Sequence, residues 1–239
     1  FNSSKLKFKF HEDEVSIEIY FVGDRGITLS IKGEVNLENQ QKIWWIGAEI
    51  EASPNLSDVV LDVVPGMNNL TLFLNPYQLG SRDALKARLE SLWQDVLKLD
   101  LSTSFQGKLI EVPVHYGGEK GPDLFDVAKT HHMTPEKVIE LHTQPIYTVY
   151  FVGFMPGFVY LGGLDSAIHT DRRSTPRLKI PAGSVGIGGS QTGVYPGESP
   201  GGWQIIGNTG MAFFDMNREE PSLFMPGDQL KFVAKEITL

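Results

Sequence analysis

Four basic residues lie close together in an otherwise acidic chain. Arg172, Arg173, Arg177 and Lys179 fall within eight residues, whereas the 239-residue chain has a net charge of −8. Pro176 interrupts the run, which predicts a loop or a short extended segment rather than a helix. Such a cluster can hold a carboxylate or a phosphate, because guanidinium groups bind these anions in a bidentate manner. The same residues would also suit a solvated edge strand, where Lys and Arg discourage aggregation.

The basic cluster lies within a stretch, residues 153–207, that is rich in glycine and proline. It holds 13 of the 25 glycines and 5 of the 14 prolines. Glycine lets the backbone approach a ligand and proline stiffens a loop, so the stretch predicts a rigid, concave binding site. Barrel corners also need glycine, and this plainer interpretation stays open. Disorder is disfavoured by large apolar residues that can anchor the loops: Phe154, Phe158, Tyr160, Leu161, Val185, Ile187, Tyr195 and Trp203.

The segment Gly197–Gly201 matches the G-x-S-x-G pattern of a serine nucleophile, but its context does not fit that chemistry. The motif uses the backbone N–H of the residue after serine as an oxyanion donor, and Pro200 has no N–H. A pair of glycines then stands where a helix should begin. We therefore predict no serine-hydrolase site and assign no catalytic residue, although the Ser199 hydroxyl can contact a ligand.

Other catalytic and cofactor-binding patterns are missing from the sequence. There is no cysteine and no G-x-x-x-x-G-K-[ST] phosphate loop, which excludes thiol chemistry and binding of ATP by a P-loop. The six histidines are scattered without metal-ligand spacing, so no metal site is predicted. Only His142, at the end of a predicted helix, is kept as a site candidate.

Composition also limits the partners and the compartment. The net negative charge argues against general nucleic-acid binding. No apolar run approaches the roughly 18 residues of a membrane span. The first ten residues alternate Lys with apolar residues, unlike a signal peptide, and the lack of cysteine fits a reducing compartment. These features predict a soluble, cytoplasmic protein that binds neither nucleic acid nor membrane.

The first hundred residues predict two strand–strand–helix units. Alternation of apolar and polar residues indicates the strands, and apolar residues at helical spacing indicate the helices. Asn36 and Ser81 are the expected helix caps. We expect one sheet under two helices, an α+β sandwich of the ferredoxin-like kind over residues 1–100. The expected elements are strands at 15–21, 27–31, 59–64 and 70–74, and helices at about 36–51 and 81–96.

Residues 106–239 predict a second domain that is mostly β. The preceding stretch, 98–108, is polar and aperiodic, as expected for a linker. Two short helices are expected, at 122–129 and after a Thr134 cap. Beyond Pro145 short apolar pieces alternate with Gly/Pro turns, which favours a closed or nearly closed β-barrel. Examples of these pieces are 146–152, 183–187, 204–206, 212–216 and 229–233.

A series of short motifs runs through the second half. In chain order they are Pro113–Gly118, Gly121–Leu124, Tyr147–Tyr150, Gly153–Phe158, Tyr160–Leu164, Thr175–Arg177, Pro181–Ile187, Gln191–Gly193 and Glu198–Trp203. Together they resemble the 5-oxoprolinase B subunit family, also called KipI-like or allophanate hydrolase subunit 1. The resemblance is weaker over the first hundred residues. Met155 and Gly197 depart from the residues usual in the family, which would alter the shape of a pocket.

The resemblance implies both a fold and an activity. The fold is an N-terminal α/β domain followed by a cyclophilin-like β-barrel. The activity is that of one component of an ATP-dependent hydrolase complex, inactive alone, that opens 5-oxo-L-proline to L-glutamate. ATP would act through the complex, after phosphorylation of the lactam oxygen. The implied partners are the C subunit of 5-oxoprolinase, related to a biotin-dependent carboxylase domain, and the A subunit.

The resemblance also gives the candidate residues a role. Lactam opening passes through charged species, so we expect the basic cluster to hold the substrate carboxylate or a phosphoryl group. Gln191, Tyr195 and Glu198 would line the site at the junction with the C subunit, with Ser199 and His142 as further contacts.

Two other functions remain open at this level. A KipI-like protein inhibits a sensor histidine kinase by protein contact alone, and a barrel cleft can bind a peptide as well as a lactam. A component of an allophanate hydrolase or urea amidolyase would keep an enzymatic role but act on another substrate.

Overall fold

The computed structural model describes residues 16–239, which form two compact units. One comprises the described residues up to Val35 together with Trp45–Leu99, and the other comprises Asn36–Trp44 and Asp100–Leu239. Val15, the expected start of the first strand, and the alternating first ten residues lie outside the described part. None of the described helices is long and apolar enough to cross a membrane.

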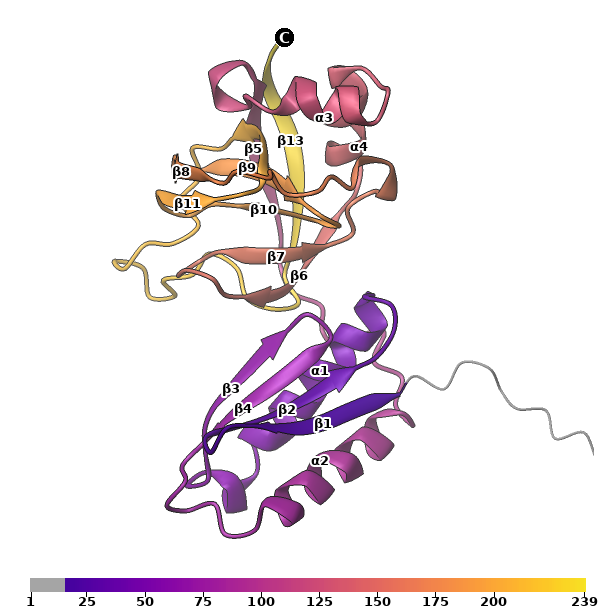
Figure 1. Cartoon of the computed structure of the whole chain (residues 1–239), viewed down its shortest axis with the longest axis vertical. Coiled ribbons are helices and arrows are strands. Elements are labelled where there is room, and N and C mark those ends of the chain that lie inside the picture. Colours follow the sequence, from indigo (N-terminus) through magenta and orange to yellow (C-terminus); the bar gives the residue numbers. More distant parts are fainter. Residues whose placement is uncertain (1–15) are drawn as a thin grey trace, which may run out of the picture. The chain divides into compact units, whose positions relative to one another are not determined.

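The first unit contains a four-stranded antiparallel sheet in the order β1-β2-β4-β3 (Figure 1). Alternate residues of β4 are buried, because a strand points successive side chains to opposite faces, whereas β2 is buried throughout except at Ser30. Ser81 caps α2 by accepting a hydrogen bond from the backbone N–H of Ala84. The predicted order of strand, strand and helix, repeated once, is confirmed. The elements of this half of the chain are β1 (Ile17–Val22), β2 (Gly26–Ile31), α1 (Leu37–Glu51), η1 (Pro54–Leu56), β3 (Val60–Gly66), β4 (Asn69–Leu74) and α2 (Arg82–Val96). The residues of α1 up to Trp44 are counted with the second unit.

Seven strands of the second unit form a closed barrel in the order β10-β7-β6-β13-β5-β12-β9. Neighbouring strands are antiparallel except β13 and β5, which run parallel. The predicted barrel is therefore confirmed. Its strands are β5 (Leu109–Gly117), β6 (Tyr147–Val152), β7 (Val159–Gly162), β9 (Ser184–Gly188), β10 (Gln191–Val194), β12 (Gln204–Asn208) and β13 (Gln229–Thr238).

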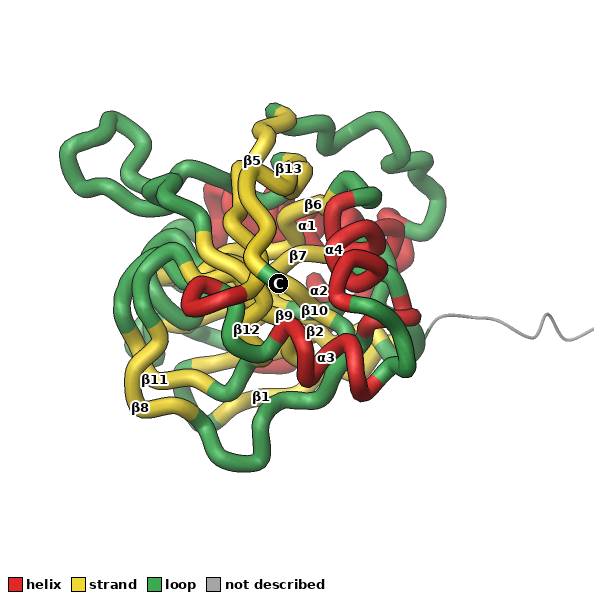
Figure 2. The backbone as a smooth tube through the Cα atoms, turned by 90° about the horizontal axis from the view of Figure 1, so that it is seen from above, coloured by secondary structure: helices red, strands yellow, loops and turns green. Residues whose placement is uncertain are grey.

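Two helices and an outer ribbon complete the second unit. The helices α3 (Leu124–Thr130) and α4 (Pro135–Thr143) lie side by side next to β5 and β13 (Figure 1). Their apolar faces share one core with the inward-facing residues of the barrel. Strands β8 (Arg177–Ile180) and β11 (Ser199–Gly201) pair only with each other and lie at the outer edge of the unit (Figure 2).

The structure differs from the sequence prediction in several elements of this unit, since β7, β8, β10 and β11 were also not among the pieces named from the sequence. Residues 212–216 form no strand, because Phe213 anchors them in the core as a loop that has only an isolated bridge from Phe214 to Ser222. Strand β5 was not expected, since Pro113 lies in its middle. Short 3-10 turns also occur, at η2 (Gly118–Lys120) and η3 (Ser166–Ile168).

A buried histidine joins α4 to the barrel. Thr192 donates its hydroxyl to the carbonyl of Gly186 at 2.9 Å, so it accepts the N–H of His142 Nε2 at 2.7 Å. Nδ1 is then the acceptor for the Tyr116 hydroxyl, also at 2.7 Å. The imidazole is fully buried and stacks on Phe232. Both ring nitrogens are thus used within the core, which explains why this helix carries a histidine on its buried face.

This network makes stability depend on pH. Burial lowers the pKa of His142 from 6.5 to about 3, so between these values only the unfolded chain binds the proton. The free energy of unfolding therefore falls as the pH falls through this window, by up to about 1.4 kcal/mol per pH unit. Above about pH 6.5 the contribution of His142 is constant.

We expect His142→Gln to show a shallower decline than the wild type, because glutamine does not titrate. Urea denaturation from about pH 4.5 to about pH 8 measures both slopes. Parallel slopes in the two proteins would contradict a neutral buried imidazole.

Candidate functional site

A buried carboxylate organises the basic cluster. Asp123, just before α3, accepts hydrogen bonds from Arg173 at 2.8 Å and from both terminal nitrogens of Arg177 at 2.7 Å. The backbone N–H of Ile205 donates a further bond at 2.6 Å. The Asp123 side chain is 2% exposed, and its backbone N–H also bonds to the Ile205 carbonyl. One acidic residue thereby connects α3, β8, β12 and the loop before β8.

Arg173 and Arg177 are therefore held by the protein itself. Their binding of a substrate anion remains a prediction. Such an anion would have to share guanidinium groups that already neutralise Asp123. The backbone N–H of Arg173 also bonds to the carbonyl of Gly202 at 2.7 Å. The loop that carries the basic cluster is consequently fastened at several points.

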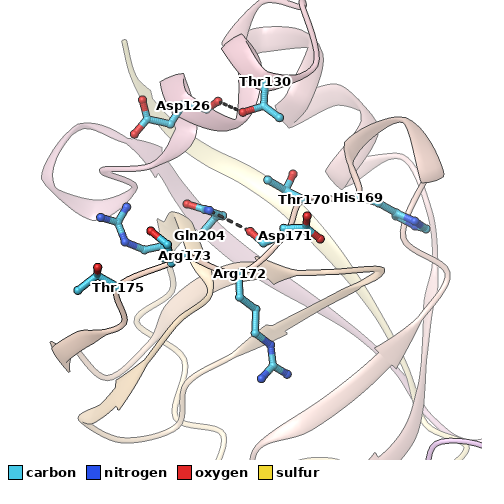
Figure 3. A pocket seen from close by; sticks show the side chains of 10 residues that line it. Asp126, Thr130, His169, Thr170, Asp171, Arg172, Arg173, Thr175 and Gln204 are labelled. Atoms are coloured by element: carbon cyan, nitrogen blue, oxygen red, sulfur yellow. Dashed lines mark hydrogen bonds between the residues drawn. The ribbon is translucent and has the colours of Figure 1, made fainter.

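Arg172, next to this clamp, has a different environment. Within residues 16–239 its guanidinium has neither an ion-pair partner nor a hydrogen bond. In Figure 3 its side chain points away from Asp126 and Thr130, whereas Arg173 extends to another side of the loop. Arg172 reaches a small pocket of about 110 Å³ beside a cluster of aromatic rings. The lining residues of this aromatic pocket are Phe154, Phe158, Tyr160, Arg172, Tyr195, Pro200, Gly201, Gly202 and Trp203.

The walls of the aromatic pocket form a second, smaller apolar core outside the barrel. The Phe158 ring contacts Tyr195 and Trp203 edge-on, with centroids 5.4 and 5.5 Å apart. Phe158, Tyr195 and Trp203 are each less than 5% exposed. Edge-to-face contacts hold aromatic rings in defined orientations, so the pocket is preformed.

Several glycines of the 153–207 stretch serve to make room for these rings. A Cβ at Gly188 would collide with the Trp203 indole, and one at Gly201 would collide with the Tyr195 hydroxyl. The two interpretations of the stretch are thus not exclusive, because glycines in the barrel strands and in the outer ribbon let aromatic side chains pack close to the backbone.

Two tyrosines line the aromatic pocket. Burial raises the pKa of Tyr160, and the positive charge of Arg172 partly opposes this rise. Burial also raises the pKa of Tyr195, opposed by a hydrogen bond from the Trp203 backbone and by Arg172. Both phenols therefore stay protonated at neutral pH. The pocket combines an apolar ring surface, two neutral hydroxyls and one unpaired cation, which is a suitable environment for a small ring that carries a carboxylate.

A larger polar pocket of about 520 Å³ lies on the other side of the same loop (Figure 3). Gln204 donates to the Asp171 carbonyl at 3.0 Å, and hydroxyl groups line much of the remainder. Asp126 and Asp171 line this pocket together with Arg172 and Arg173, so its acidic and basic residues balance. Arg172 is the one charged residue in the lining of the aromatic pocket, which favours an anionic ligand there. We therefore take the aromatic pocket as the candidate site.

The remaining predicted site residues lie outside the aromatic pocket, and two of them, Arg177 and Lys179, line another pocket of about 230 Å³. Lys179 forms an exposed ion pair with Glu198 at 2.9 Å on the outer ribbon. The Ser199 hydroxyl bonds to the carbonyl of Pro200. Gln191 lies on β10, and its buried side-chain nitrogen lacks a hydrogen-bond partner in the described part of the chain. Of the nine candidates, only Arg172 and Tyr195 line the aromatic pocket.

His142 is separated from the aromatic pocket by its place in the core. Its full burial and its two internal hydrogen bonds leave no ring nitrogen for a ligand. Conversely, the role of Asp123 was missed, since its partners follow it by 50 to 82 residues. The aromatic residues around Trp203 were expected only as loop anchors. Among the described residues no three His, Cys, Asp or Glu side chains gather as metal ligands.

Comparison with known proteins defines the class to which this arrangement belongs. Residues 17–224 match the family model described as carboxyltransferase domain, subdomain C and D. The fold is also similar to that of the Kluyveromyces lactis urea amidolyase, with a TM-score of 0.78 at 19% identity over 93% of this chain and 15% of that one. At this identity the likeness concerns the fold alone.

Closer relatives specify the family within that class. The chain is 46% identical over 218 residues to the 5-oxoprolinase B subunit of Haemophilus influenzae, covering 91% of this chain and 98% of the relative. Relatives of the same name from Escherichia coli O157:H7 and Bacillus subtilis are 45% and 39% identical, over 91% and 92% of this chain and 95% and 93% of theirs. The chain belongs to the 5-oxoprolinase B subunit family.

A solved structure extends this comparison to a longer chain. The crystal structure of TTHA0988 is similar to 89% of this chain at 34% identity, with a TM-score of 0.72. This chain spans 40% of the length of that protein.

The Asp123 clamp predicts a large loss of stability when its charge is removed. Asp123→Asn leaves two guanidinium groups without a counter-charge, and we expect it to lower the free energy of unfolding by about 2–4 kcal/mol. The loss is below that of a fully buried pair because the Arg173 and Arg177 side chains are 33% and 27% exposed.

Chemical denaturation measures this change, with Glu198→Gln as the matched control. That variant removes an ion pair exposed at both ends, which predicts an effect below about 1 kcal/mol. Equal losses in the two variants would show that Asp123 does not organise the loop.

Proposed function

We propose that this chain is the B subunit of an ATP-dependent 5-oxoprolinase complex and that it binds 5-oxo-L-proline in the aromatic pocket. The observation that carries the proposal is the unpaired guanidinium of Arg172 at the edge of a small aromatic cavity. 5-Oxo-L-proline is a flat five-membered lactam that carries one carboxylate. Its ring would face Phe158 and Trp203, and its carboxylate would bind Arg172 through charge-assisted hydrogen bonds.

The tyrosine hydroxyls give the chain a further role in the reaction. A lactam is a poor electrophile, and transfer of a phosphoryl group from ATP to its oxygen makes the ring carbon open to attack by water. The C–N bond then breaks, and L-glutamate and phosphate are released. Protonated Tyr160 or Tyr195 can donate a hydrogen bond to the lactam oxygen and orient it.

The nucleotide is assigned to the partner chains. A cavity of about 110 Å³ with aromatic walls does not fit a nucleoside triphosphate together with a lactam. The sequence also lacks a P-loop. We propose that the C subunit, a carboxylase-related chain, and the A subunit complete the active site in a cytoplasmic hetero-oligomer. The length of TTHA0988, in which a region similar to this chain is part of a longer polypeptide, supports such an association.

The finer structural assignments belong to the same proposal. We take the four-stranded sheet with its two helices as a ferredoxin-like α+β domain, residues 1–100, and the closed barrel as cyclophilin-like, residues 106–239. The kinase-inhibitor and allophanate or urea alternatives have no observation of their own in this chain that favours them.

Reconstitution tests the function directly. Purified chain mixed with the A and C subunits should release ADP and L-glutamate when 5-oxo-L-proline and ATP are supplied, and omission of this chain should abolish both products. The chain alone should be inactive, since its pocket has no place for ATP. Turnover by the chain alone, or by the two partners without it, would contradict the proposal.

Arg172 provides a residue-level test in the same complex. Arg172→Gln removes the counter-charge of the substrate carboxylate, and we expect kcat/KM for 5-oxo-L-proline to fall about ten- to a hundredfold, mainly through KM. The kcat/KM of Arg172→Lys should lie between those of the wild type and of Arg172→Gln, because lysine keeps the charge without the bidentate geometry. Arg88→Gln, at an exposed position of α2, is the control and should leave kcat/KM unchanged. An unaffected KM in Arg172→Gln would exclude this carboxylate site.

A further inference from the structure

Phe154 has a backbone conformation that does not suit a bulky residue. Its φ is 68°, in the left-handed region that favours glycine. Phe154 is one of three non-glycine residues with positive φ in the described part of the chain, the others being Asn68 and His132. Asparagine and histidine tolerate this region better than phenylalanine does. Strain of this kind persists only where the surrounding structure imposes it, and it is often found at ligand sites.

A short hydrogen-bonded loop imposes the conformation. The loop Gly153–Phe158, which joins β6 to β7, is called here the Phe154 turn. The N–H of Met155 bonds to the carbonyl of Gly153 at 2.8 Å, across Phe154. Two more bonds close the loop, from Gly153 to the Phe158 carbonyl and from Phe158 to the Met155 carbonyl. Glycine at position 154 would satisfy the same bonds without strain, so the turn itself does not require a phenylalanine.

The ring of Phe154 instead belongs to the aromatic pocket. It meets Phe158 edge-on at 5.4 Å and Tyr195 edge-on at 6.4 Å between centroids. Phe154 is 62% exposed, whereas Phe158 and Tyr195 are 2% and 3% exposed. Phe154 is therefore the exposed wall of the pocket, and the other rings form its buried walls.

We propose that Phe154 is a specificity-determining residue that restricts the aromatic pocket to small rings bearing a carboxylate, so that a five-membered lactam is preferred to a six-membered one. This inference rests on the proposed function. The pocket has a volume of only about 110 Å³, so one additional methylene in the ring is significant. The strained turn holds the Phe154 ring where it restricts the space.

Phe154→Gly tests the proposal by a change of specificity. In the reconstituted complex, the substrates compared are 5-oxo-L-proline and its six-membered homologue, 6-oxopiperidine-2-carboxylate. We expect KM for the five-membered lactam to rise about tenfold, because one wall is lost, with a smaller change in kcat. The ratio of kcat/KM for the homologue to that for 5-oxo-L-proline should rise by at least about tenfold.

A stability measurement separates this role from a structural one. Glycine relieves the strain, so the Tm of Phe154→Gly should equal or exceed that of the wild type. Tyr77→Ala, at an 89% exposed aromatic residue of the first unit, is the control and should change neither the Tm nor the ratio. A fall in Tm, or an unchanged substrate ratio in Phe154→Gly, would overturn the proposal.

A binding titration tests the role of Phe154 without enzymatic turnover. The chain alone is titrated with 5-oxo-L-proline and with the six-membered homologue while its tryptophan fluorescence is recorded, since Trp203 lines the pocket. The wild type should prefer the smaller ring and Phe154→Gly should lose that preference. If the wild-type complex does not turn over 5-oxo-L-proline, the proposed function fails, and the role of Phe154 is judged from this titration. An equal preference for the smaller ring in the wild type and in Phe154→Gly would refute the proposed role of Phe154.

Discussion

The candidate site depends on the buried carboxylate of Asp123. A charge with a side-chain exposure of 2% is stable only when its hydrogen-bonding capacity is filled, and here two arginines and a backbone N–H fill it. The donors come from a loop, from the outer ribbon and from a barrel strand. The requirement of one charge for partners therefore determines where three separate segments meet.

This arrangement divides a run of similar residues into two functions. Arg172 and Arg173 are adjacent, yet Arg173 is used by Asp123 and Arg172 is left without a partner. Because the loop is fastened on both sides of Pro176, through Arg173 and Arg177, the free guanidinium is carried on a rigid support. A cation on a rigid loop loses little conformational entropy when it binds an anion, which favours recognition of a small ligand.

The sequence predicted the architecture better than it predicted the site. Local signals were sufficient for the caps at Ser81 and Thr134 and for the barrel, because turns and apolar pieces depend on neighbouring residues. Strand β5 escaped prediction because Pro113 is unusual within a strand. The pairing of Asp123 with Arg177, 54 residues apart, has no local signal. The four cations consequently appeared equivalent, and His142 appeared available although both of its ring nitrogens are used in the core.

The glycines and the aromatic residues of the 153–207 stretch depend on each other, because the glycines leave the space that the rings occupy. Rings as large as that of Trp203 can pack close to a barrel strand only where the strand lacks side chains, as at Gly188. Such packing yields a second apolar core outside the barrel, and a core that is not closed on its outer side leaves a pocket. The open side is then bordered by Phe154, which the chain holds at a φ that glycine would adopt more easily. Glycine is thus used where rings must approach the backbone and is absent where a ring must project from it. The same residues therefore meet the needs of the barrel strands and shape the aromatic pocket.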